Sequence, residues 1–227
     1  MAALKEITLN DVRINTLYLE DSLSAILHTI LFVRAPSAVN SKDRTCTSLS
    51  PLIYATCGPK EVDKIIETSI EAFKKSLFVS NGCMKGEVVL SFFDKREVKE
   101  YLGLFTRNET VCFESWRISI VLLDAGGNDG IAALATGNVQ QDKAAAYRSA
   151  YEQITNTMMS ILEATNTATD HIPSSMYDYE IFVTQPTPCH SMDPNSNKQV
   201  QKDTTVNNYH ADAHRRSQSV DAVQYRS

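Results

Sequence analysis

The sequence predicts an α+β fold in which helices pack on one face of a mainly antiparallel sheet. Segments with apolar residues at helical spacing are interspersed with runs rich in β-branched and aromatic residues, without an internal repeat. With 227 residues, of which 43% are hydrophobic, the chain can bury one sizeable core. We therefore expect one globular domain with a tail.

The first helix is predicted over residues 20–33, after a short strand at residues 5–9. Its apolar residues fall on one broad stripe: Leu23, Ile26, Leu27, Ile30 and Leu31. Acidic residues in the first turn and Arg34 at the end suit the helix dipole, and Pro36 stops the helix. This pattern is typical of a core helix.

The next part of the chain is expected to hold a loop, a strand and a second helix. Residues 37–50 are polar and rich in Ser and Thr, as connecting loops are. Residues 52–56 suggest a strand that Gly58–Pro59 closes, and Pro59 suits the first turn of a helix. That helix carries a second apolar stripe and ends at Asn81–Gly82.

Two adjacent strands are predicted at residues 86–93 and 116–123. The segment between them, residues 94–115, is interpreted as a long loop, and its large apolar residues need a partner. The longest helix is expected over residues 142–163, and a last strand over residues 179–184.

The predicted domain covers residues 1–184. From residue 185 to residue 227 the sequence is rich in Pro, Ser, Asn, Gln and Asp and has almost no large aliphatic residues. Such a segment cannot bury enough apolar surface to fold, so we expect a disordered tail.

The composition argues against several classes of protein. A net charge of −5 does not suit a general nucleic-acid binder. The N-terminus lacks the apolar core of a signal peptide, and no apolar run approaches the length of a membrane span, so we expect a soluble, cytoplasmic protein. Five cysteines without a Cys-x-x-Cys pair favour reduced, buried, unreactive thiols.

No motif indicates catalysis, a cofactor or a metal. Gly126–Gly127 and Gly130 lack the Lys-Ser/Thr that completes a phosphate-binding loop. The neighbouring acidic residues lack the closing Glu of a calcium loop. His210 and His214 have helical ligand spacing but lie in the predicted tail. His28 is interpreted as a buried, hydrogen-bonded core histidine.

Four segments in order carry a family resemblance: residues 27–31 (Leu-His-Thr-Ile-Leu), residues 61–75, residues 87–93 and residues 113–119, which hold the only Trp. The His171–Ile–Pro173 turn fits the same pattern. Over residues 12–184 the chain resembles the autophagy-related protein 101 family of HORMA-domain proteins, in a fungal-like form with a divergent finger loop and C-terminus.

The resemblance implies a non-catalytic scaffold subunit of the autophagy-initiation kinase complex, without a cofactor. Such a subunit would pair with the HORMA domain of autophagy-related protein 13 and stabilise it. It would help to recruit downstream factors to the cytoplasmic preautophagosomal structure, also called the phagophore assembly site. Association with the phagophore membrane would be indirect, and no transmembrane segment is expected.

Family members recruit those factors through a Trp-Phe finger, and the equivalent loop here lies within residues 94–115. Phe105 can stand for the finger's Phe, whereas Leu102 or Leu104 occupies the Trp position. A Leu-Phe pair can fill a hydrophobic pocket but lacks the area and the N–H of an indole. A loop that folds back onto its own core is the other interpretation.

After Thr184 the sequence offers no convincing strand pair for the movable C-terminal belt of HORMA proteins. The pairing surface is therefore expected elsewhere, for example on the long helix.

Two further alternatives stay open. An ordered belt would instead favour an adaptor for a closure peptide, as in checkpoint or polymerase-accessory proteins. A deep pocket lined by residues such as His28, Cys57 and Asp124 would favour a small enzyme.

Overall fold

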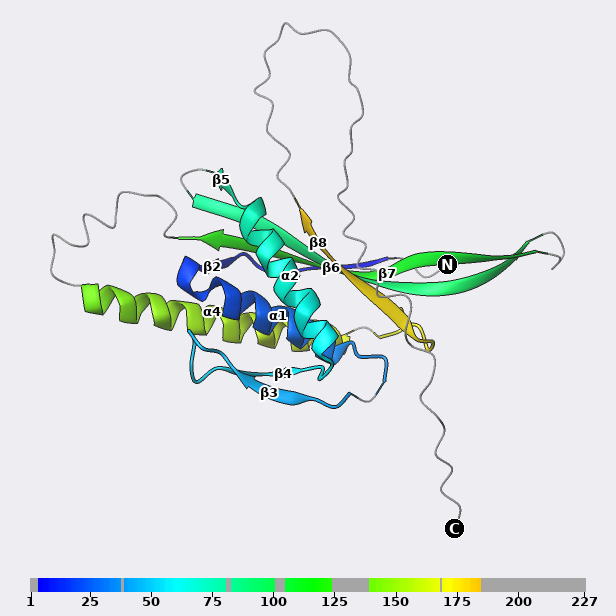
Figure 1. The fold of residues 1–227 in the computed structure, drawn as a ribbon, viewed down its shortest axis with the longest axis horizontal. Helices are drawn as coiled ribbons and strands as arrows, with labels where there is room; N and C mark the ends of the chain where they lie inside the picture. The colour runs from blue at the N-terminus through cyan, green and yellow to red at the C-terminus, as the bar shows by residue number, and fades with distance from the viewer. Residues whose placement is uncertain are drawn as a thin grey trace, which may run out of the picture. The chain divides into compact units, whose positions relative to one another are not determined.

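A computed structural model describes residues 4–37, 39–80, 83–100, 105–123, 139–167 and 169–184. Figure 1 shows the elements that these residues form. In chain order they are β1 (Lys5–Thr8), β2 (Val12–Ile14), the short 3₁₀ helix η1 (Thr16–Tyr18), α1 (Leu19–Val33), β3 (Lys42–Thr45), β4 (Ile53–Thr56), α2 (Lys60–Ser76), β5 (Phe78–Ser80), β6 (Cys83–Glu100), β7 (Phe105–Leu122), α4 (Val139–Thr167) and β8 (Tyr177–Thr184). The predicted α+β class is confirmed.

The main sheet is built around β6 and β7, which pair antiparallel. β1 and then β2 lie parallel to β7 along its other edge, whereas β5 and β8 lie antiparallel to β6. The sheet is therefore mainly antiparallel, as predicted, with a parallel margin at β1 and β2.

One face of this sheet carries the core. Along β6 and β7 every second residue is buried, and this set comprises Val88, Leu90, Phe92, Trp116, Ile118, Ile120 and Leu122. The other face is more mixed: Val121 on it is buried, whereas Arg117 is exposed and its Nη1 donates a hydrogen bond of 2.8 Å to Glu87 Oε1. Because strand side chains alternate between the two faces, this pattern directs the main apolar set toward the helices.

The central helix is α1, which packs against both α2 and α4. Its buried residues lie around most of its circumference: Leu19, Ser22, Leu23, Ala25, Ile26, Leu27, His28, Thr29, Ile30 and Leu31. The window Thr16–Val33 is long and apolar enough to cross a membrane by composition alone. Helices buried in a protein core pass the same test, and the burial of α1 confirms the predicted core helix.

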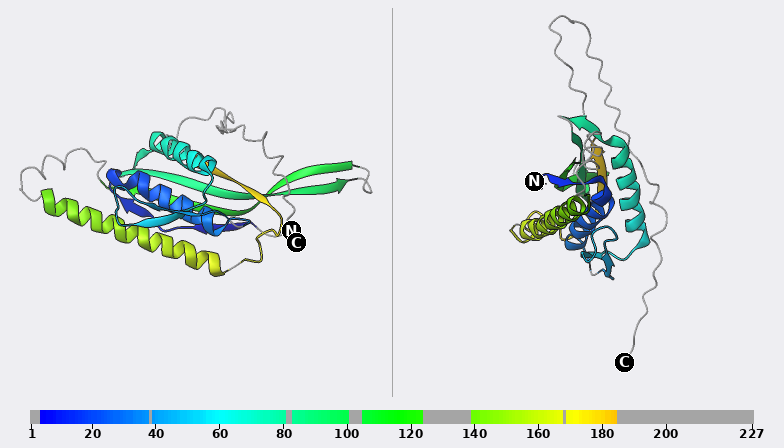
Figure 2. Two further views of the ribbon diagram at one scale, coloured as in Figure 1. Left: turned by 60° about the horizontal axis from the view of Figure 1, so that its bottom comes forward. Right: turned by 90° about the vertical axis from the view of Figure 1, so that its left-hand side faces the viewer.

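α2 packs its predicted stripe onto the sheet through Ile66, Ile70 and Phe73. The ring of Phe73 lies against Gly86 of β6, where an added Cβ would be 2.5 Å from Phe73 Cε2. α4 lies at the other side of α1, beside β2, as Figure 2 shows. There Gln153 Oε1 accepts a hydrogen bond of 2.9 Å from the Arg13 backbone N–H, which satisfies a donor on the free edge of β2.

The segment predicted as a loop over residues 37–50 contains a strand. β3 pairs antiparallel with β4 in a separate two-stranded sheet. All four β3 residues are exposed, and their sequence, Lys-Asp-Arg-Thr, shows no apolar alternation. The strand forms because β4 offers it a partner, which a local pattern does not reveal.

The largest correction concerns residues 94–115, which are mostly strand and not a long loop. β6 and β7 are each 18 residues long and stay paired out to Glu100 and Phe105. The sequence of the extension is mainly charged and polar, so the apolar alternation that predicts strands is missing there.

The chain divides into the units Met1–Thr187 and Pro188–Ser227. The second unit, and with it the tail predicted at residues 185–227, lies outside the described residues. Asp124, the glycine motif at residues 126–130, His210 and His214 lie outside them too.

Candidate functional site

The main candidate for an interaction site is a two-stranded arm formed by residues 95–100 of β6 and residues 105–110 of β7. The six pairs run in register from Lys95 with Thr110 to Glu100 with Phe105. At about 3.3 Å per residue this ribbon is about 20 Å long. Figures 1 and 2 show it extending beyond the part of the sheet that the helices cover.

The arm begins where the flanking strands end. The last pair of β8 with β6 joins Tyr177 to Asp94, and the first pair of β1 with β7 joins Lys5 to Glu114. Beyond these two pairs, no other described strand supports the ribbon. Its two strands therefore depend on each other and on the point where they leave the sheet.

A β-bulge marks this point, which we call the root of the arm. Phe92 pairs with Glu114 and Phe93 pairs with Cys112, so that Phe113 is the extra residue on β7. Phe113 and Glu114 are both buried, at 2% and 0% exposed. A bulge bends and twists the strand that carries it, so the arm departs from the sheet here.

The described side chains of the arm are hydrophilic. Lys95, Glu97, Arg107 and Asn108 are exposed, and Arg96 lies opposite Glu109. Opposite charges at paired positions favour the pairing of two strands in solvent. The described part of the arm is therefore a solvent-exposed ribbon outside the core.

The predicted finger residues stand in the sequence where β6 ends and β7 begins. Leu102 and Leu104 fall within residues 101–104, which lie outside the described residues. Phe105 is the first residue of β7, and its backbone pairs with Glu100. The alternative of a loop that folds back onto its own core is not supported by the described residues 95–100 and 105–110, which leave the core as a ribbon.

A second candidate surface lies on α4. Ile154 and Ile161 are fully buried, and Met158 packs partly against the core. Met159 and Leu162, one helical turn apart, are 53% and 39% exposed. Residues at this spacing lie on one face of a helix, so α4 presents a small apolar patch to solvent.

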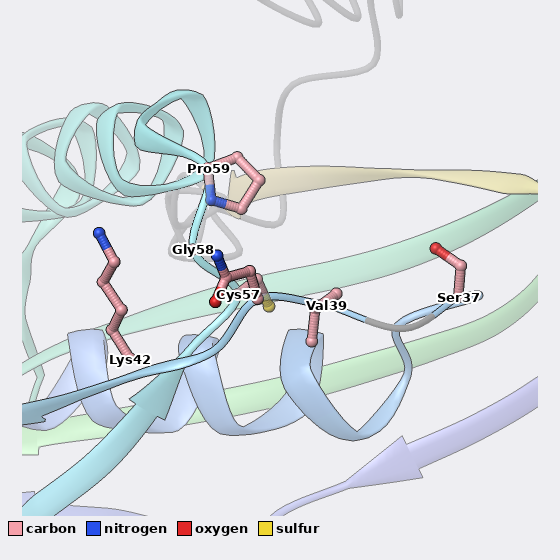
Figure 3. A pocket seen from close by; sticks show the side chains of 7 residues that line it. Ser37, Val39, Lys42, Cys57, Gly58 and Pro59 are labelled. Carbon is pink, nitrogen blue, oxygen red and sulfur yellow. The ribbon is translucent and has the colours of Figure 1, made fainter. Parts of the chain in front are cut away.

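A pocket of about 440 Å³ lies between the chain after α1 and the start of α2, as Figure 3 shows. Its lining comprises Ser37, Val39, Asn40, Lys42, Cys57, Gly58 and Pro59. Gly58 has φ +87°, and an added Cβ would lie 2.1 Å from the Asn40 carbonyl oxygen. Only a glycine fits this close approach, which fixes the junction between β4 and α2.

The chemistry around this pocket does not favour an enzyme. Burial and the nearby Asp63 raise the pKa of the Cys57 thiol, whereas a nucleophilic cysteine needs a lowered pKa. Burial lowers the pKa of His28 to about 4, and His28 is not among the residues that line the pocket. Within the described part of the chain, no three His, Cys, Asp or Glu side chains gather as metal ligands.

Two predictions about single residues are settled in this region. Cys46 and Cys57 are buried free thiols, as expected. His28 is fully buried, as expected, but it is not hydrogen-bonded: no described residue makes a hydrogen bond to either ring nitrogen. Its neighbour is Asp63, whose Oδ1 lies 3.5 Å from Nε2.

The sequence analysis missed Glu114, a fully buried carboxylate at the root of the arm. A signal was present, because Glu114 stands between Phe113 and Trp116, just before the strand predicted at residues 116–123. Acidic residues are almost never fully buried unless they are paired. Arg34, which we interpreted as a charge for the helix dipole, is its buried partner at 2.8 Å.

A helix-covered sheet with a projecting polar arm and an exposed apolar patch, but without an activated nucleophile among the described residues, is typical of a protein-interaction module. A family model described as "Autophagy-related protein 101" matches residues 11–178. The chain therefore belongs to the autophagy-related protein 101 family and has an autophagy-related role. It is 23% identical over 171 residues to Autophagy-related protein 101 of Arabidopsis thaliana, and the match covers 73% of this chain and 78% of that protein.

Proposed function

We propose that this protein is a non-catalytic adaptor of the autophagy-initiation kinase complex. It would pair, as a HORMA-like domain, with the HORMA domain of autophagy-related protein 13 and stabilise it. It would also recruit downstream factors at the phagophore assembly site in the cytoplasm. Membership of the autophagy-related protein 101 family supports the cellular process, and the two exposed surfaces support the role of an adaptor.

The observation that carries the recruiting role is the arm. In the sequence, residues 101–105 from the end of β6 to the start of β7 read Tyr-Leu-Gly-Leu-Phe, an apolar run between the charged residues Glu100 and Arg107. Binding energy at protein interfaces concentrates in a few apolar or aromatic anchors that enter a pocket on the partner. The exposed strands of the arm, about 20 Å long, would let such an anchor contact a partner at a distance from the rest of the domain.

For the pairing surface we propose the exposed face of α4 around Met159 and Leu162. This patch is separate from the core contacts of the helix, since Ile154 and Ile161 point into the core. Methionine adapts its shape to a partner surface, and an exposed apolar pair on a rigid helix suits docking of another folded domain.

The test is co-purification of the full chain with the autophagy-related protein 13 HORMA domain from the same host, followed by size exclusion. Two double variants separate the surfaces: Met159→Asp/Leu162→Asp on α4 and Leu104→Asp/Phe105→Asp on the arm. Glu163→Gln is the matched control on α4, because it changes an exposed residue next to the patch without adding an apolar or charged group.

We expect a one-to-one complex with the wild type, with the control and with the arm variant, and none with the α4 variant. The arm variant should instead fail to recruit downstream factors to the assembly site in cells. If the wild type forms no complex at micromolar concentration, the pairing is wrong, and short closure peptides become the next ligands to test. If only the arm variant loses the complex, the pairing surface is the arm and not α4.

A further inference from the structure

Glu114 is the centre of a buried polar cluster at the root of the arm. Its Oε1 accepts hydrogen bonds from Arg34 Nε at 2.8 Å and from Trp116 Nε1 at 2.5 Å, and its Oε2 lies 2.5 Å from His171 Nε2. The carboxylate is 0% exposed. A buried charge is tolerated only when its acceptor sites are occupied in this way, so each of the three donors is needed.

The cluster joins five segments of the chain. Arg34 ends α1, and its Nη1 donates to the Thr165 carbonyl near the end of α4 at 3.5 Å. The Arg34 carbonyl accepts a 2.5 Å hydrogen bond from the hydroxyl of Tyr177, the first residue of β8. Glu114 and Trp116 belong to β7, and His171 belongs to the chain between α4 and β8. One set of contacts therefore links the end of α4 to the root of the arm.

The segment of residues 169–176, which we call the connector, contacts the root of the arm twice. His171 contacts Glu114 on β7, and Ser175 Oγ donates a 3.1 Å hydrogen bond to Asp94 Oδ1 on β6. Asp94 is 5% exposed and also accepts from Arg96 Nε of the arm at 2.5 Å. Directly after the connector, Asp178 forms an ion pair with Lys95.

We propose that the connector is a clamp that fixes the direction of the arm, with His171 and Glu114 as positioning residues. A two-stranded ribbon is marginal and twists freely by itself, and this one leaves the sheet at a bulge, where a strand bends most readily. The clamp holds both strands of the ribbon on either side of the bulge. The functional meaning of the clamp rests on the proposed function. If α4 and the arm are binding surfaces, the clamp makes the direction of the arm depend on the end of α4.

The test measures the distance between two nitroxide labels on the full chain by pulsed electron paramagnetic resonance. One label replaces Asn108 on the arm and the other replaces Glu67 on α2, both exposed, and both are introduced as unnatural amino acids so that the native cysteines stay unlabelled. The compared chains are wild type, His171→Leu, His171→Gln, Ser175→Ala and Glu87→Gln. The measurement needs no partner, so it does not depend on whether the proposed pairing occurs.

We expect one narrow distance distribution in the wild type and one about twofold broader in His171→Leu. His171→Gln should restore the narrow distribution, because its amide N–H can donate to Glu114. Ser175→Ala removes the one hydrogen bond from Ser175 to Asp94, on an exposed residue, so this variant should fold and is expected to broaden the distribution less. Glu87→Gln breaks an ion pair on the other face of the same strands and should leave it unchanged.

Distributions of wild-type width in both His171→Leu and Ser175→Ala would overturn the proposal. Equal broadening in Glu87→Gln would overturn it too, because the effect would then not belong to the clamp. A normal clamp together with failed pairing to autophagy-related protein 13 would reject the proposed function and leave the clamp intact.

Discussion

His28 Nε2 and Asp63 Oδ1 lie 3.5 Å apart between α1 and α2, and neither atom forms a hydrogen bond with a described residue. The ring of His28 stacks on Tyr54, with centroids 5.4 Å apart. Burial lowers the pKa of His28 to about 4, although Asp63 acts in the opposite direction. The folded protein therefore holds His28 neutral where the unfolded chain would protonate it.

This difference predicts acid sensitivity. Because the folded pKa is below the unfolded value of 6.5, the unfolded chain binds more protons between pH 6.5 and pH 4, so stability falls as the pH falls through this window. The loss from this one group should reach about 3 kcal/mol by pH 4. Urea denaturation at several pH values measures it.

The variant for this test is His28→Phe, which keeps a ring against Tyr54 and removes the titrating group. Its stability should vary less with pH between 6.5 and 4 than that of the wild type. Equal pH dependence in the two proteins would show that other groups cause the acid sensitivity.

Gly58→Ala should be strongly destabilising. The residue has φ +87°, and an added Cβ would lie 2.1 Å from the backbone oxygen of Asn40, which cannot move aside as a flexible side chain can. We expect a loss of at least about 2 kcal/mol in the free energy of unfolding, measured by denaturant titration. Ser37→Ala, another change in the wall of the same pocket, should cost little. A small effect of Gly58→Ala would mean that the Asn40 segment rearranges easily.

Two Glu→Gln substitutions on β6 and β7 should differ greatly in cost. Glu114→Gln weakens a fully buried charge cluster and leaves Arg34 buried without its counter-charge, which costs about 3 to 5 kcal/mol. Glu87→Gln breaks a partly exposed ion pair with Arg117, which costs about 0 to 1 kcal/mol. Thermal unfolding of both variants tests the difference, and similar melting temperatures would contradict the importance of the buried cluster.

The buried thiols should resist alkylation in the folded protein. Burial raises the pKa of Cys46 to about 12, and it also raises the pKa of Cys57. At pH 8 the reactive thiolate of Cys46 is then about a thousandfold rarer than at its usual pKa of 9.0. Mass spectrometry after brief iodoacetamide treatment should find both residues unmodified in buffer and modified in denaturant. Rapid modification of Cys57 in the folded protein would instead favour an activated nucleophile and thus the enzyme alternative.

The sequence by itself determined the elements whose pattern is local. The stripes of α1 and α2 are visible because core contacts repeat with the helical period, and the strands at residues 86–93 and 116–123 are visible because β-branched and aromatic residues fill them. The family is also readable from the chain, since its motifs stand in order along residues 12–184.

Only the tertiary structure decided the features that depend on partners distant in sequence. β3 is held by its pairing with β4, and the two strands of the arm are held by their pairing with one another. These strands are mainly polar, so their sequences show no hydrophobic period. Arg34 and Glu114 are 80 residues apart, and their burial follows from a bulge and from the packing of five segments. In the sequence such an ion pair is seen only as two distant charged residues. Only the fold shows that both are buried and that each is the other's counter-charge.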